Sequence, residues 1–120
     1  MRYYNAKSMK TKLTYSYYNK EYTIDISNNE NILSLIENNI NTCKQLGITY
    51  PNDEVDDKIR KFVDEELKNS KFYRGMGHAD KFLIYTESND GKIEKLHVIN
   101  GSFSDEKVQE IIKEIKKEYN

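Results

Sequence analysis

The chain is poor in residues that cross-link or interrupt a polypeptide. Its 120 residues include one cysteine, one proline, five glycines and no tryptophan. A single cysteine, Cys43, excludes an intramolecular disulfide framework and favours a reducing compartment, so we expect a cytoplasmic protein. No run of about 18 apolar residues occurs, which leaves no candidate for a membrane-spanning helix. The N-terminal residues carry positive charge without an apolar core, so no secretory signal is readable.

Ligands and motifs for metal or cofactor chemistry are also scarce. Two histidines, His78 and His97, and one cysteine are too few for a structural zinc site without carboxylates. The sequence contains no Walker A loop, dinucleotide fingerprint, nucleophile elbow or helical His-x-x-x-His pair. We therefore expect no metal, no cofactor and no assignable catalytic residue. No motif carries a resemblance to a known family.

What the chain does contain is unevenly distributed. Residues 1–20 hold one arginine, four lysines and no acid, a local net charge of +5, so the rest carries −6 of the total of −1. Five of the ten tyrosines fall in the same segment. The overall composition, 37% hydrophobic and 32% charged, is typical of one globular domain. The abundant Asn, Lys, Ile and Tyr indicate an AT-rich genome. We expect a flexible or tag-like segment over residues 1–9 and a single domain over residues 10–120.

Two stretches have the period of β-hairpins. Apolar and polar side chains alternate over residues 13–26 on both sides of Asn19-Lys20. Residues 82–99 are apolar or alternating on both sides of Asn89-Asp90-Gly91, the strongest turn signal in the chain. Each stretch therefore predicts two antiparallel strands.

Three further segments have a helical period. Ser27-Asn28-Asn29-Glu30 is a capping-box pattern before a first helix that Gly47 ends. Acidic residues open a second helix after Pro51, and Ser104 begins a third. The order ββααββα predicts an α+β domain of two layers. In it, a four-stranded, mostly antiparallel sheet made of two hairpins carries three helices on one face and leaves the other face open.

The segment Lys71–Lys81 joins the second helix to the third strand and holds two glycines, an arginine and a histidine. Glycine lets backbone N–H groups turn toward an anion, and His78 near Asp80 fits a general base oriented by a carboxylate. However, Gly75-x-Gly77 lacks a third glycine and precedes a strand, so it matches no phosphate-binding motif. Three interpretations stay open. The segment is a connection that needs glycine, a partner-binding loop, or a small-molecule, nucleotide or hydrolase site centred on Arg74 and His78.

The basic N-terminal end is a second candidate surface. Lys10, Lys12 and Tyr18 are predicted on the strand face opposite the apolar side chains. Lysines beside an exposed aromatic ring can follow phosphates and stack on a base, so a nucleic-acid-binding regulator is the alternative function. Edge strands also carry lysines merely to block aggregation.

Taken together, these features predict a small cytoplasmic macromolecule-binding protein without catalytic activity. The lack of cofactor motifs and of a catalytic set favours this class, and we expect the partner to be another protein rather than a membrane. An inhibitor, immunity or regulatory role on a phage or mobile element is an association with small domains of this composition. The predicted contacts are Tyr73, Arg74, His78 and Lys81, with Lys10, Lys12 and Tyr18 as a second surface.

Overall fold

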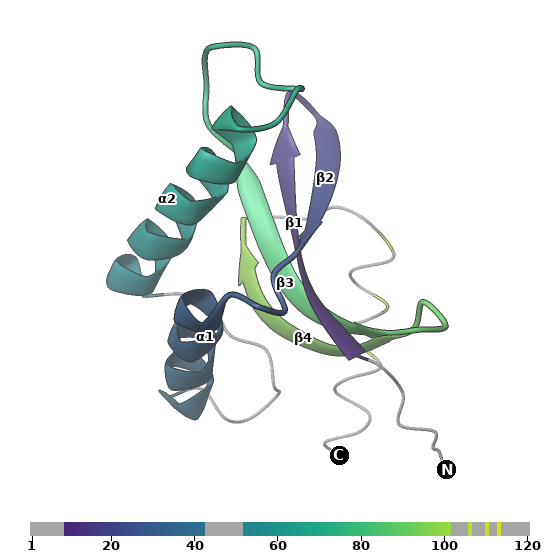
Figure 1. The fold of residues 1–120 in the computed structure, drawn as a ribbon. Coiled ribbons are helices and arrows are strands. Elements are labelled where there is room, and N and C mark those ends of the chain that lie inside the picture. Colours follow the sequence, from purple (N-terminus) through teal and green to yellow (C-terminus); the bar gives the residue numbers. More distant parts are fainter. Residues whose placement is uncertain (1–8, 43–51, 102–105, 107–109, 111–112, 114–120) are drawn as a thin grey trace.

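A computed structural model of the chain describes residues 9–42 and 52–101 and the single positions 106, 110 and 113. The described part is α+β (Figure 1). Every strand pairing in it is antiparallel, which confirms the predicted sheet and its two hairpins. The elements are β1 (Met9–Tyr17), β2 (Lys20–Asp25), α1 (Glu30–Thr42), α2 (Asp53–Lys68), β3 (Lys81–Ser88) and β4 (Ile93–Asn100).

The two hairpins join into one sheet through β1 and β3. The strand order is β2-β1-β3-β4, and Leu13 of β1 lies opposite Ile24 on one side and Ile84 on the other. β1 is therefore a central strand. Thr14 and Ser16, whose polar character predicted an exposed face, are consequently buried between neighbouring strands.

Both helices pack on the same face of the sheet (Figure 1). Burying each large apolar side chain of this layer stabilises the fold by roughly 1.5–3 kcal/mol before entropy is counted. The main buried apolar residues are Leu13, Tyr15, Tyr17, Ile26, Ile32, Ile36, Val55, Ile59, Val63, Leu67, Phe82, Ile84 and Val98.

The first helix begins later than the sequence pattern predicts. Its N-cap is Asn29, whose Oδ1 accepts the Ile32 N–H at 3.1 Å, and not Ser27. Ser27 is held by the sheet instead, because backbone pairing with β1 continues past β2 through Ile26. Its hydroxyl oxygen accepts the Thr11 N–H at 2.9 Å and so cannot serve the helix.

The face opposite the helices is not open, contrary to the prediction. Leu83, Tyr85 and Ile99 point to that face and are buried. Tyr85 Oη also accepts a hydrogen bond from Thr14 Oγ1 at 3.3 Å. That face is therefore not available as a broad binding platform.

The predicted third helix and the end of the first lie largely outside the described residues, as does Cys43. The single described positions 106, 110 and 113 are helical and exposed. The third helix itself stays a prediction, since the described part of the chain contains two helices. Within residues 9–42 and 52–101, neither helix has the length and apolarity to cross a lipid bilayer.

Arg60 fixes α2 to the sheet and to the segment that precedes β3. Its Nε donates to Asp56 at 3.0 Å, and its Nη2 donates to Asn100 of β4 at 2.6 Å. Its Nη1 donates to the Ala79 carbonyl at 3.4 Å. The end of the Lys71–Lys81 segment is thus held against a rigid frame.

Candidate functional site

The β1–β2 hairpin turns through two residues in the left-handed conformation. Tyr18 has a φ of 50° and Asn19 a φ of 62°. Two successive positive φ values suit a tight hairpin, because the turn then twists in the same sense as the strands. Asparagine accepts this conformation, but a bulky side chain there is uncommon. The turn leaves the Tyr18 side chain 45% exposed at the end of the sheet.

The Lys71–Lys81 segment is pinned to this turn by one buried hydroxyl group. Tyr17 Oη donates a hydrogen bond to the Met76 carbonyl at 2.6 Å and accepts the Arg74 N–H at 3.1 Å. The Tyr17 ring also stacks on that of Tyr73, with 6.2 Å between centroids. A single side chain of β1 therefore positions the backbone of the segment at two places.

The glycines of the segment have the backbone angles that the sequence interpretation required. Gly75 and Gly77 have φ values of 81° and 83°. A Cβ on Gly77 would lie 3.5 Å from the Tyr17 ring, whereas a Cβ on Gly75 would meet nothing within 4 Å. The distance at Gly77 is an ordinary van der Waals contact, so both glycines serve the positive φ of the turn rather than close packing.

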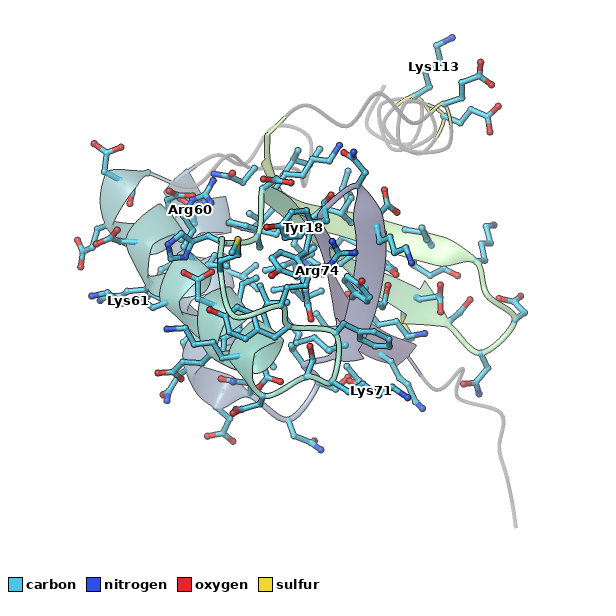
Figure 2. All side chains as sticks on the ribbon, turned by 90° about the horizontal axis from the view of Figure 1, so that it is seen from above. Tyr18, Arg60, Lys61, Lys71, Arg74 and Lys113 are labelled. Carbon is cyan, nitrogen blue, oxygen red and sulfur yellow. The ribbon has the colours of Figure 1, made fainter. Side chains whose placement is uncertain are left out.

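Exposed apolar side chains occur both in the β1–β2 turn and in the Lys71–Lys81 segment that is hydrogen-bonded to the adjoining Tyr17. Tyr18, Phe72 (48% exposed) and Met76 (64% exposed) are three of the four large exposed apolar residues in the described part; the fourth, Met9, lies at the other end of β1. The Arg74 guanidinium stacks over the Tyr18 ring at 4.6 Å (Figure 2). We call this set the turn–loop surface: Tyr18, Phe72, Arg74, Met76 and His78.

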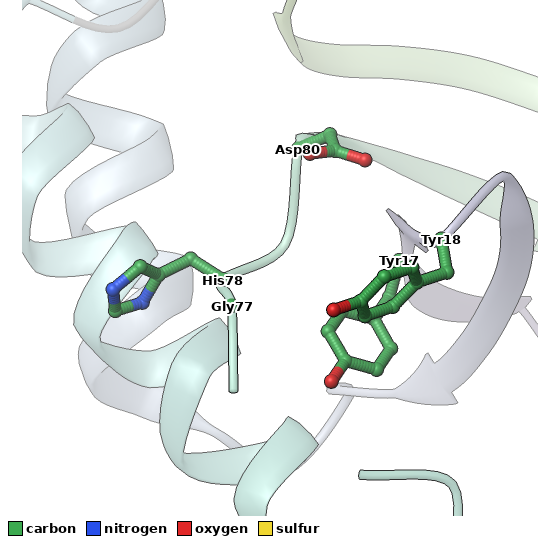
Figure 3. A pocket seen from close by; sticks show the side chains of 5 residues that line it. All are labelled: Tyr17, Tyr18, Gly77, His78 and Asp80. Atoms are coloured by element: carbon green, nitrogen blue, oxygen red, sulfur yellow. The ribbon is translucent and has the colours of Figure 1, made fainter. Parts of the chain in front are cut away.

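A pocket of about 260 Å³ opens beside Tyr18 (Figure 3). The His78 ring turns away from it toward α2, where its Nδ1 lies 2.9 Å from Asp64. The Asp80 side chain is exposed and has no hydrogen bond or ion pair with any described residue. The lining residues are Tyr17, Tyr18, Gly77, His78 and Asp80.

The structure divides the predicted basic surface. Tyr18 joins the turn–loop surface, but Lys12 lies six positions earlier along the chain, about 20 Å away for an extended strand. Lys12 Nζ also donates to Glu87 Oε1 at 2.7 Å, and this hydrogen bond raises the pKa of Lys12. Lys10 lies farther still, opposite Glu87 in the strand register.

The four contacts predicted in the Lys71–Lys81 segment have different positions. Arg74 and His78 are exposed on the turn–loop surface. Tyr73 is half-buried behind it, against the core. Lys81 pairs with the buried Ser16, which places its side chain on the sheet face opposite the helices.

Sequence reasoning missed Phe72 and Met76. The signal for them was available, since they are large apolar residues in a polar, glycine-containing segment and outside any periodic pattern. Such residues have no helix or strand face to bury them, so exposure on a binding surface is a reasonable expectation.

The pocket has few groups for covalent chemistry. The carboxylate that contacts His78 is Asp64 of α2, and not Asp80, the residue that one of the open interpretations paired with it. The lining residues include no aliphatic hydroxyl, thiol or amine nucleophile. In the described part of the chain, no three acidic, histidine or cysteine side chains form a group that could hold a metal ion. Comparison of the chain with protein-family models, curated proteins and solved structures returned no match.

Proposed function

We propose that this protein binds another protein through the turn–loop surface and has no chemistry of its own. The exposure of Tyr18, Phe72 and Met76, together with the stacking of Arg74 on Tyr18, carries the proposal. Aromatic residues, methionine and arginine are the types enriched at protein interfaces and at their energetic hot spots. A cytoplasmic inhibitor, immunity or regulatory role, on a phage or mobile element, is the setting that we propose for it.

Two side chains of this surface, Phe72 and Arg74, are held in place by contacts with the hairpin, which favours the same conclusion. Phe72 stacks on Tyr22 of β2 with 4.8 Å between ring centroids, and Arg74 is held on both its backbone and its side chain. Binding through groups that are already ordered loses little conformational entropy. A surface of this kind can therefore reach useful affinity with a modest contact area.

The two other function classes have weaker support. A nucleic-acid-binding hairpin needs several lysines near Tyr18, but of the lysines of this hairpin only Lys20 lies beside it, because Lys12 is engaged by Glu87 at a distance. A hydrolase centred on Arg74 and His78 needs a base that faces the pocket, but the His78 ring turns away from it toward Asp64, and the lining offers no aliphatic hydroxyl, thiol or amine nucleophile. We therefore assign Arg74 and His78 to partner contact.

Capture of the partner from the source cells tests the proposal. Met76→Glu should reduce the captured partner roughly tenfold or more, because a charge would enter an apolar contact. Met9→Glu makes the same change at an exposed methionine at the far end of β1 and should leave capture unchanged.

Three results would contradict the proposal. Equal losses with both variants would show that the surface has no special role. Turnover of a substrate by the pure protein would replace binding with catalysis. Capture of nucleic acid that disappears between about 50 and 200 mM salt would favour the nucleic-acid alternative.

A further inference from the structure

Resting on that proposed function, we infer that the pocket beside Tyr18 receives a basic side chain, a lysine or an arginine, from the protein partner. The pocket combines a carboxylate without a partner in the described chain with two tyrosine rings. Carboxylate and aromatic groups together are the usual surroundings of a bound ammonium or guanidinium.

Asp80 supplies the charge. Four other acids of the described chain, Glu54, Asp56, Asp64 and Glu87, each contact a basic or histidine side chain of the same protein. Asp80 has no such contact, and Figure 3 shows its carboxylate on the same side of the segment as the tyrosine rings. His78 cannot neutralise it, because the imidazole points to Asp64.

The tyrosines supply the walls. Tyr18 already holds one cation on its ring, the Arg74 guanidinium, which lies outside the pocket lining. The Tyr18 hydroxyl has no hydrogen-bond partner among the residues that the structure describes and can accept an N–H from a ligand. Tyr17 forms the second wall, and its own hydroxyl is already used by the segment.

The size of the pocket favours one side chain over a cofactor. Its volume of about 260 Å³ is below the roughly 300–1,000 Å³ that is usual for small-molecule and cofactor sites. It also adjoins Tyr18 of the turn–loop surface, so a partner resting on that surface could insert one long side chain. This position makes the pocket a part of the proposed interface.

Titration of the full chain with Nα-acetyl-lysinamide and Nα-acetyl-argininamide, followed by amide NMR shifts, tests the inference. We expect saturable shifts at Tyr18, Gly77 and Asp80 with dissociation constants of the order of millimolar. Nα-acetyl-glutamate amide, which has the opposite charge, should give none.

Two variants locate the binding. Asp80→Asn keeps the side-chain shape and the backbone hydrogen bond to Ser16, and should weaken amine binding and partner capture by roughly tenfold. Asp57→Asn removes an equal charge from the exposed side of α2 and should have no effect. Tyr18→Phe removes only the hydroxyl and should give a loss of a few-fold.

The outcomes separate this inference from the proposed function. Absence of saturable shifts, equal binding of the glutamate compound, or equal effects of Asp80→Asn and Asp57→Asn would overturn the inference. If Asp80→Asn leaves capture intact while Met76→Glu abolishes it, the proposed interface stands. The inference that the pocket receives a basic side chain of the partner is then wrong. If Met76→Glu also leaves capture intact, the proposed function itself fails.

Discussion

The β1–β2 and β3–β4 hairpins both turn through residues with positive φ, but the residues that do so differ. In the β3–β4 turn, Gly91 takes a φ of 81°, and Asp90 Oδ1 accepts the Lys92 N–H at 3.2 Å. In the β1–β2 turn a tyrosine, Tyr18, takes a φ of 50°. A Cβ on Gly91 would meet nothing within 4 Å, whereas Tyr18 holds Arg74 and lines a pocket. A bulky residue in a conformation that favours glycine or asparagine indicates that its side chain is needed there.

The two histidines repeat this contrast. His97 of β4 is largely buried, with Nε2 2.6 Å from Thr86 Oγ1, and its buried Nδ1 has no hydrogen-bond partner among the described residues. Burial, and to a smaller extent Lys95, lowers the pKa of His97 to about 4. His78 lies exposed on the turn–loop surface. The β3–β4 hairpin therefore has the features of a structural element. The β1–β2 turn and the segment beside it have the features of a surface that contacts a partner.

The largest expected effect is acid destabilisation through His97. The unfolded chain takes up this proton near pH 6.5 and the folded chain only near pH 4. Above about pH 6.5, His97 is neutral in both states and costs no free energy of unfolding. As the pH drops from 6.5 toward 4, the free energy of unfolding falls, by something of the order of 3 kcal/mol. Urea unfolding at pH 7 and pH 4.5 measures it. His97→Gln should remove this part of the pH dependence, and His78→Gln should leave it unchanged. If His78→Gln removed it and His97→Gln did not, the assignment of a structural role to His97 would be wrong.

The next effect concerns the hydroxyl that pins the Lys71–Lys81 segment. Tyr17→Phe should lower the free energy of unfolding by about 2 kcal/mol, because the Met76 carbonyl and the Arg74 N–H both lose a partner. Hydrogen exchange at the Arg74 amide should accelerate as well. Tyr73→Phe removes a hydroxyl that has no hydrogen-bond partner in the described chain and serves as the control. Similar losses in both variants would argue against the pinning.

Two glycines with the same backbone angle separate the loss of stability from the loss of partner binding. Gly75 and Gly91 both have a φ of 81° and open space where a Cβ would lie. Alanine at either position should therefore lower the free energy of unfolding by a similar amount, about 1 kcal/mol. Partner capture should fall only for Gly75→Ala, which distorts the turn–loop surface. A loss of capture with Gly91→Ala would show that both ends of the sheet are contacts.

The local sequence pattern predicts the individual helices and strands, but it does not predict how they pack together. Alternation over residues 13–26 and the turn signal at Asn89-Asp90-Gly91 predict both hairpins, because period and turn chemistry act over a few residues. The pairing of Lys12 with Tyr85 joins positions 73 apart, and no local period encodes it. For the same reason the burial of Thr14 on a central strand could not be predicted.

The candidate site was recoverable in part. Glycine and charge placed Arg74 and His78 in an exposed segment, which the structure confirms. That this segment lies beside Tyr18 depends on the hydrogen bonds of the Tyr17 hydroxyl to Met76 and Arg74. These are tertiary contacts, which local sequence does not reveal. Likewise, His78 selects Asp64 over the nearer-in-sequence Asp80 because α2 packs beside the segment.

The smallest expected change in stability is the most direct test of why a tyrosine occupies the β1–β2 turn. Tyr18→Asn should relieve backbone strain by up to about 1 kcal/mol, since asparagine tolerates positive φ. It should also remove the ring beneath Arg74, a contact that stabilises by about 0.5–1 kcal/mol at an exposed site. The two terms nearly cancel, so the urea midpoint should hardly move while partner capture falls.

Asn19→Gly provides the control for that variant. It relaxes the neighbouring position of the same turn, which has a φ of 62°, and leaves the Tyr18 ring in place. We expect it to keep partner capture and to raise stability slightly, because glycine adopts positive φ without steric strain. If Tyr18→Asn instead retained capture and gained stability, the tyrosine would have no role that compensates for its strained backbone. The contrast between the two hairpin turns would then be one of composition and not of function.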